Sequence, residues 1–152
     1  LIVDGAHNEH SVARLCQTVR DYVPYGKITV LFGCSSDKDL NGMAKHLSEL
    51  ADEIAVCISR HPRSMDFNIV SNGFRELGVP TRLVENVGVG LRSLMDSVSD
   101  SDLVLVTGSL FVVAEALESW YGIEPELYPE LQLDSRSMYG IAERDPFGKS
   151  NG

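Results

Sequence analysis

The chain has 152 residues, of which 43% are hydrophobic and 23% charged, and this length suits one folded domain. Its 13 glycines and 6 prolines are too few for a collagen-like or disordered chain, and no apolar run reaches the ~18 residues of a membrane span. The net charge of −9 argues against a nucleic-acid-binding face, because phosphates are neutralised by clustered Lys and Arg. We therefore predict a globular domain without nucleic-acid or membrane partners.

The cysteines indicate the compartment. Cys16, Cys34 and Cys57 are an odd number without a Cys-x-x-Cys spacing, so a disulfide scaffold or a zinc ribbon fits poorly. No basic segment followed by an apolar one, as in a signal peptide, is recognisable. We predict a reducing, cytoplasmic location.

Short β-rich runs alternate with amphipathic stretches along the chain. The predicted strands are residues 1–4, 27–32, 53–58, 81–85 and 102–107, and several of them are continuously apolar. The predicted helices are residues 11–23, 40–50, 66–77, 87–98 and 110–120, with apolar positions at helical spacing. This alternation predicts an α/β fold: a Rossmann-like, mostly parallel sheet of five to six strands with helices on both faces.

Ligands of such a sheet bind beyond the carboxyl ends of the strands, and the loops there carry polar residues with two interpretations each. Asp4 is either a turn residue or an acceptor for a ribose or a cation's water. His7 is either a plain loop residue or a ligand for an anionic group. Lys38 is either solvated or holds an anion together with the Ser-rich loop before it. Ser109 is either a helix cap or, with the helix dipole, a donor to a carboxylate.

Taken together, the motifs of these loops resemble a known family. In chain order they are DGAHN at residues 4–8, Phe32-Gly33 followed by DKD at 37–39, Pro62-Arg63, and VTGSL at 106–110. This combination resembles the C-terminal domain of folylpolyglutamate synthase/dihydrofolate synthase, in the Mur ligase superfamily. The resemblance covers about residues 1–120. Glu9 stands where the family often has proline, and it keeps an acid in the first helical turn, which the helix dipole favours.

The resemblance implies a reaction and a domain organisation. The reaction is ATP-dependent amide formation, in which a folate or dihydropteroate carboxylate becomes an acyl phosphate that the amine of L-glutamate attacks. Residues 1–121 are then a Mur ligase C-terminal (glutamate-ligase) domain, and residues 122–152 a partly disordered extension. The partners are the protein's own N-terminal and central domains, which carry the P-loop and hold most of the Mg²⁺. The chain has no GxxxxGK[ST] loop, and we expect it to be inactive alone.

The resemblance also implies roles for four residues. Asp4 matches a family aspartate at the ATP site, and His7, Lys38 and Ser109 match residues near the incoming glutamate. Arg63 matches a frequent family residue to which we assign no role. No catalytic residue and no metal ligand is assigned within this domain.

Two alternatives remain open at this point. The first is a domain of another Mur-type amino-acid ligase, such as a peptidoglycan-precursor ligase, which differs in an acceptor site outside these motifs. The second is a non-catalytic Rossmann-like binding module, whose binding would not depend on His7, Lys38 or Ser109. The motifs do not specify whether the acceptor is dihydropteroate, folate or both.

Overall fold

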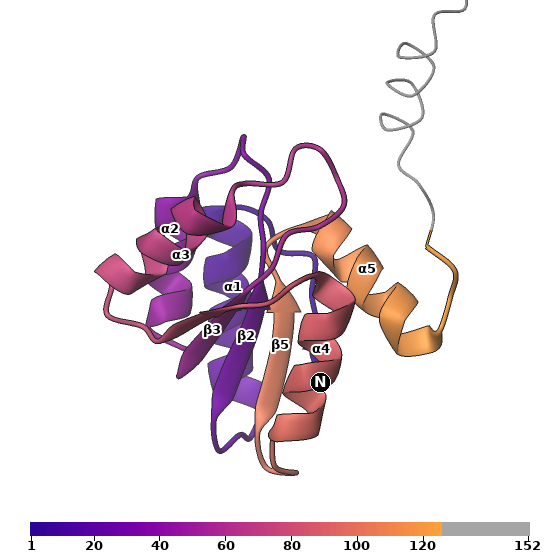
Figure 1. The fold of residues 1–152 in the computed structure, drawn as a ribbon. Coiled ribbons are helices and arrows are strands. Elements are labelled where there is room, and N and C mark those ends of the chain that lie inside the picture. The colour runs from indigo at the N-terminus through magenta and orange to yellow at the C-terminus, as the bar shows by residue number, and fades with distance from the viewer. Residues whose placement is uncertain (126–152) are drawn as a thin grey trace, which may run out of the picture.

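The computed structural model describes residues 1–125 of the chain. Over this part it contains a parallel sheet of five strands in the order β1-β5-β2-β3-β4 (Figure 1). The strands are β1 (Ile2–Val3), β2 (Ile28–Phe32), β3 (Glu53–Val56), β4 (Thr81–Leu83) and β5 (Leu103–Thr107). The helices are α1 (Glu9–Tyr22), α2 (Leu40–Ser48), α3 (Phe67–Glu76), α4 (Val87–Ser97) and α5 (Leu110–Tyr121).

Each predicted element is present, with ends that differ by at most two residues, as expected for boundaries read from a pattern. The predicted fold class is therefore confirmed. Of the predicted extension at residues 122–152, the part from 126 onward lies outside the described residues. Among residues 1–125 we find no helix of the length and hydropathy that crossing a membrane requires.

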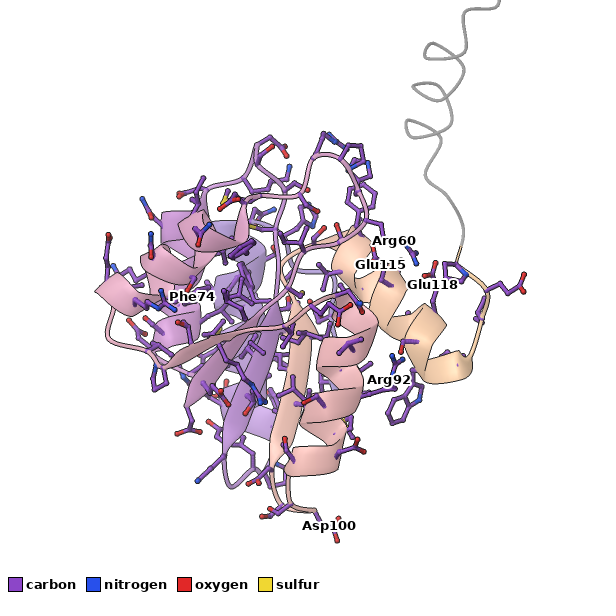
Figure 2. All side chains as sticks on the ribbon, in the orientation of Figure 1. Arg60, Phe74, Arg92, Asp100, Glu115 and Glu118 are labelled. Carbon is purple, nitrogen blue, oxygen red and sulfur yellow. The ribbon has the colours of Figure 1, made fainter. Side chains whose placement is uncertain are left out.

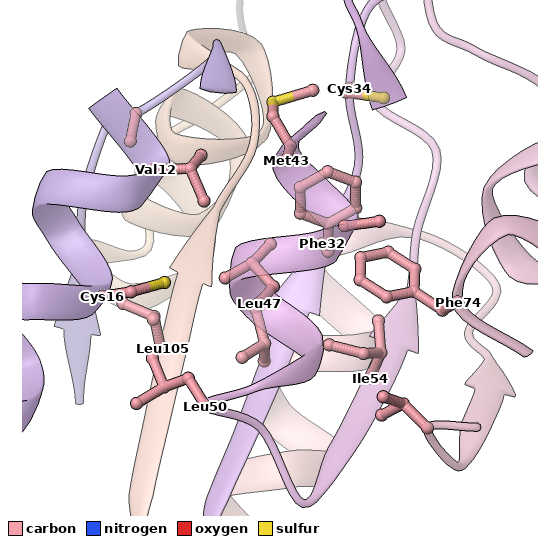
Figure 3. Close-up of a cluster of buried hydrophobic side chains, with 14 of the residues drawn as sticks. Val12, Cys16, Phe32, Cys34, Met43, Leu47, Leu50, Ile54, Phe74 and Leu105 are labelled. Carbon is pink, nitrogen blue, oxygen red and sulfur yellow. The ribbon is translucent and has the colours of Figure 1, made fainter. Parts of the chain in front are cut away.

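Helices cover both faces of the sheet, α1, α2 and α3 on one face and α4 and α5 on the other (Figure 1). Side chains of neighbouring strand positions point to opposite faces, so Phe32 packs toward α2 and α3 while Leu31 packs toward α4. Each face of the sheet has its own hydrophobic core. Figure 3 shows the core between the sheet and α1, α2 and α3, in which the rings of Phe32 and Phe74 meet edge to face at 5.2 Å. Because helices cover both faces, strand β5, which lies between β1 and β2, is buried at every position.

The strand order determines which loops become neighbours. All five strands run in one direction, so their carboxyl ends share one edge of the sheet. Because β5 lies between β1 and β2, the VTGSL segment lies beside both the DGAHN loop and the loop that carries DKD. The loop after β3, which contains Arg63, follows next along the same edge.

Candidate functional site

A cavity of about 210 Å³ opens beyond the carboxyl ends of the strands. It is lined by residues of four loops and the start of α5: His7, Ser35, Asp37, Lys38, Arg63, Gly108, Ser109, Leu110 and Phe111. Three of the four predicted site residues, His7, Lys38 and Ser109, therefore lie around one space. The fourth, Asp4, lines a neighbouring hollow, and His7 borders both.

The DGAHN loop is held by its own hydrogen bonds and by the segment after β5. The Asp4 Oδ1 atom accepts the Ala6 N–H at 2.8 Å, and the Ala6 carbonyl accepts the Gly108 N–H at 3.0 Å. Asn8 caps α1, with Ser11 completing a capping box. These bonds fix the loop in one conformation, in which the side chain of Asp4 lines the neighbouring hollow and that of His7 lines both spaces.

The contacts of His7 define its tautomer. Its Nδ1 atom lies 2.9 Å from the Gly5 carbonyl oxygen. A carbonyl only accepts, so Nδ1 carries the proton of this hydrogen bond. In the neutral imidazole, Nε2 is then the atom with the free lone pair.

Lys38 and Asp37 form an ion pair on the cavity wall. The Nζ of Lys38 lies 2.9 Å from Oδ2 of Asp37, and both side chains are partly exposed, by 34% and 48%. The hydrogen bond from Lys38 holds the pKa of the Asp37 carboxyl below its usual range. Asp39 takes a different part, because its carboxylate caps α2 by accepting the Gly42 N–H at 3.1 Å.

Ser109 is the N-cap of α5, and its side chain is buried. The Oγ atom accepts the Phe111 N–H at 3.2 Å, which leaves the hydroxyl proton for donation. The first turn of α5 contains no acidic residue, so the positive end of its dipole is not compensated there. The predicted cap is confirmed, and its geometry is compatible with a second bond to a carboxylate.

Gly108 brings the start of α5 close to β2. Its φ is +102°, in the region that favours glycine. A β-carbon there would lie 2.5 Å from the Phe32 ring and 2.7 Å from the Gly33 carbonyl oxygen. The close approach of Gly108 to this loop therefore depends on glycine.

The segment His61-Pro62-Arg63 contributes more to the cavity than its sequence indicates. His61 is only 2% exposed, and its ring stacks on Phe111 at 3.7 Å and 12°. The Arg63 N–H donates to Nδ1 of His61 at 3.1 Å, and the Arg63 guanidinium lies 5.9 Å from the centroid of the Phe111 ring. This arrangement places a second cation beside Lys38 at the cavity. In the sequence, the feature that could have indicated this contribution was the position of these residues directly after a buried strand.

An ionic cluster joins the loop after β3 to α5. Figure 2 labels its members, Arg60, Glu115 and Glu118. The buried Glu115 carboxylate accepts the Arg60 N–H at 2.6 Å, and the Arg60 guanidinium pairs with Glu118. These bonds hold the Arg63 loop against the helix whose first turn lines the cavity.

Neither the cysteines nor the carboxylates of this region form a reactive or metal centre. Burial raises the pKa of the Cys34 thiol to about 12, so it is protonated at neutral pH and a poor nucleophile. Within residues 1–125, no three His, Cys, Asp or Glu side chains gather as metal ligands. The cavity sets one carboxylate, Asp37, against two cations, a donor set that does not fit Mg²⁺.

Comparison with known proteins shows which proteins the chain is similar to. The family described as "Mur ligase, glutamate ligase domain" matches residues 1–110. A curated relative from Haloferax volcanii, "Probable bifunctional folylpolyglutamate synthase/dihydropteroate synthase", is 33% identical over 153 residues, covering 95% of this chain and 18% of its own length.

Solved structures agree in fold. A bifunctional folylpolyglutamate synthase/dihydrofolate synthase from Yersinia pestis has a TM-score of 0.70 at 28% identity, covering 78% of this chain and 27% of that chain. A structure of a synthase of the same name "with Mn, AMPPNP and L-Glutamate bound" also has a TM-score of 0.70 at 28% identity. This match covers 78% of this chain and 28% of that chain. The chain thus spans less than a third of the length of these relatives.

Proposed function

The chain belongs to the Mur ligase, glutamate ligase domain family, and on this basis we propose that it is the C-terminal domain of an ATP-dependent folate–glutamate ligase. Its part in the reaction is to bind L-glutamate and to contribute to ATP binding. The remainder of the ligase, with the N-terminal and central domains, supplies the P-loop, most of the Mg²⁺ site and the folate or dihydropteroate site. The acceptor carboxylate is activated there as an acyl phosphate, which the amine of glutamate attacks with loss of phosphate.

One observation carries this proposal: His7, Lys38 and Ser109 surround a single cavity. At about 210 Å³ this cavity is smaller than the roughly 300–1,000 Å³ of sites for drug-sized ligands, so it suits an amino acid. Glutamate brings two carboxylates. Lys38, Arg63, the Ser109 hydroxyl and the first turn of α5 are donors of the kind that bind carboxylates most strongly.

His7 has a proton-accepting role in the proposal. The amine of glutamate must release protons to become a nucleophile and to form an amide. With Nδ1 bonded to the Gly5 carbonyl, Nε2 of His7 is the atom that accepts such a proton. This role needs no other change in the loop, because the side chains of Asp4 and Asn8 hold it in place by accepting the N–H groups of Ala6 and Ser11.

Asp4 serves the nucleotide in this proposal. Its Oδ1 is engaged by the Ala6 N–H, and Oδ2 is the acceptor left for a ribose hydroxyl. The hollow beside Asp4 shares His7 with the glutamate cavity, so the nucleotide and the amino acid would lie side by side. The relative with Mn, AMPPNP and L-glutamate bound supports this pairing of ligands. The three buried, unpaired thiols support a cytoplasmic location.

The proposal is tested by titrating L-glutamate into the chain and following backbone amide shifts by NMR. Saturable shifts of Lys38, Ser109 and Phe111 are expected, and Lys38→Ala should weaken the binding. In the longer ligase, Lys38→Ala and Ser109→Ala should raise the KM for glutamate more than the KM for ATP. Equal effects on both constants would contradict the assignment.

A further inference from the structure

Asp37 is the one cavity-lining residue described here that carries a negative charge. The proposed function uses Lys38, Arg63, His7 and Ser109 but gives Asp37 no part. The carboxylate is 48% exposed, so a ligand in the cavity can reach it without any rearrangement of buried groups. It therefore needs a chemical explanation within the same site.

The pairing of Asp37 with Lys38 matches a particular class of ligand. An α-amino acid carries an ammonium and a carboxylate on one carbon, so its two opposite charges are close neighbours. The Nζ and Oδ2 atoms of the pair are also close neighbours, at 2.9 Å. A zwitterion laid antiparallel against this pair would bring both of its charges next to opposite ones.

The charges of the whole cavity are also complementary to those of an acidic amino acid. L-glutamate carries two carboxylates and one ammonium. The cavity presents two cations, Lys38 and Arg63, and one anion, Asp37. A dicarboxylate without an amine would satisfy the cations but would leave the carboxylate of Asp37 facing like charge.

Building on the proposed function, we propose that the Lys38–Asp37 pair recognises the α-amino-acid end of the substrate. Lys38 binds the α-carboxylate, and Asp37 accepts hydrogen bonds from the ammonium. Arg63 then receives the side-chain carboxylate. Asp37 is in this view a specificity-determining residue, which selects amino acids over simple dicarboxylates and holds the amine until a proton passes to His7.

The chain offers a matched control for this role. Asp39 has the same charge and lies two residues from Asp37, on the other side of Lys38. Its carboxylate caps α2 and does not line the cavity. Asparagine is as good an N-cap as aspartate, so Asp39→Asn removes one charge nearby without loss of the cap.

The experiment compares L-glutamate with glutarate, which has the same two carboxylates and no amine. Calorimetric titrations compare four forms of the 152-residue chain: the wild type and the variants Asp37→Asn, Asp39→Asn and Lys38→Ala. The wild type should prefer L-glutamate. Asp37→Asn should reduce this preference by roughly fivefold, the upper range for a partly exposed ion pair, by weakening glutamate and not glutarate. Asp39→Asn should keep the preference.

The outcomes separate the two proposals. If Asp37→Asn leaves the ratio of the two affinities unchanged, while L-glutamate binds and Lys38→Ala weakens it, the role of Asp37 is wrong and the proposed function stands. If L-glutamate does not bind and Lys38→Ala behaves as wild type, the proposed function is overturned, and the inference with it. A thermal melt of Asp37→Asn should match wild type, because the replaced side chain is exposed.

Discussion

Ser109 has two functions in our interpretation, and two substitutions separate them. Its Oγ atom accepts the Phe111 N–H, and its hydroxyl proton is proposed to reach a glutamate carboxylate. Ser109→Ala removes both bonds. Ser109→Gly also removes the hydroxyl, but glycine at an N-cap costs only a few tenths of a kcal/mol.

The expected magnitudes differ enough to be measured. Loss of the cap in Ser109→Ala should cost about 1 kcal/mol of unfolding free energy, or roughly 2–4 °C in Tm for a chain of this size. Ser109→Gly should melt close to wild type. A hydrogen bond to a charged group contributes about 1.5–3 kcal/mol, so both variants should bind L-glutamate roughly 10- to 100-fold more weakly.

Calorimetric melts and L-glutamate titrations on the same protein samples provide both readouts. Ser109→Thr keeps a hydroxyl and serves as the control for the substitution itself. If Ser109→Gly binds glutamate as tightly as wild type, the hydroxyl is a helix cap only and the carboxylate role is wrong. If Ser109→Gly is as unstable as Ser109→Ala, the magnitude assigned to the cap is wrong.

Three other predictions concern the frame of the site. Gly108→Ala should lose roughly 2–5 kcal/mol of unfolding free energy, because it combines positive-φ strain with a collision against Phe32. Gly78 has a φ of +79° with open space around it, so Gly78→Ala should lose only about 1–2 kcal/mol of unfolding free energy. If urea unfolding gave the same loss for both variants, the collision at Gly108 would have no energetic effect. Glu115→Ala deprives the Arg60 N–H of its acceptor and should cost about 1–3 kcal/mol, with faster hydrogen exchange at that amide as the specific readout. Burial raises the pKa of the Cys34 thiol to about 12, so the fraction of Cys34 present as thiolate at pH 8 is only ~10⁻⁴. We therefore expect slow reaction with a thiol reagent in the folded chain, and rapid reaction would refute this burial.

The sequence was sufficient to predict that the polar loops meet, for a physical reason. Parallel strands deliver the residues that follow them to one edge of the sheet, so Asp4, Lys38 and Ser109 had to share an edge once the strands were recognised. Their order along that edge was not predictable, because it depends on β5 inserting between β1 and β2. This insertion produces contacts such as that of Thr107 Oγ1 with the Ala6 carbonyl, 101 residues apart.

The prediction named Arg63 but gave no role to it or to His61, the two residues of the segment after β3 that shape the cavity wall. A histidine beside a proline in a polar loop looks solvated, yet His61 is buried under Phe111. The contact depends on where α5 begins and on how Arg60 binds Glu115, and both are tertiary facts without a local pattern. The position of Arg63 after a buried strand predicts the edge of the sheet at which it lies, but its exact place at the cavity depends on this contact.

The motif Asp37-Lys38-Asp39 shows how far a charge pattern can be interpreted. In sequence the two aspartates are equivalent flanks of one lysine. In the structure the start of α2 separates them, because Asp39 becomes its cap while Asp37 stays on the cavity wall with Lys38. Identical side chains two residues apart therefore differ in their contacts because the backbone places them differently. If the two Asp→Asn substitutions had equal effects on the choice between glutamate and glutarate, charge alone would explain the motif and this separation would have no functional meaning.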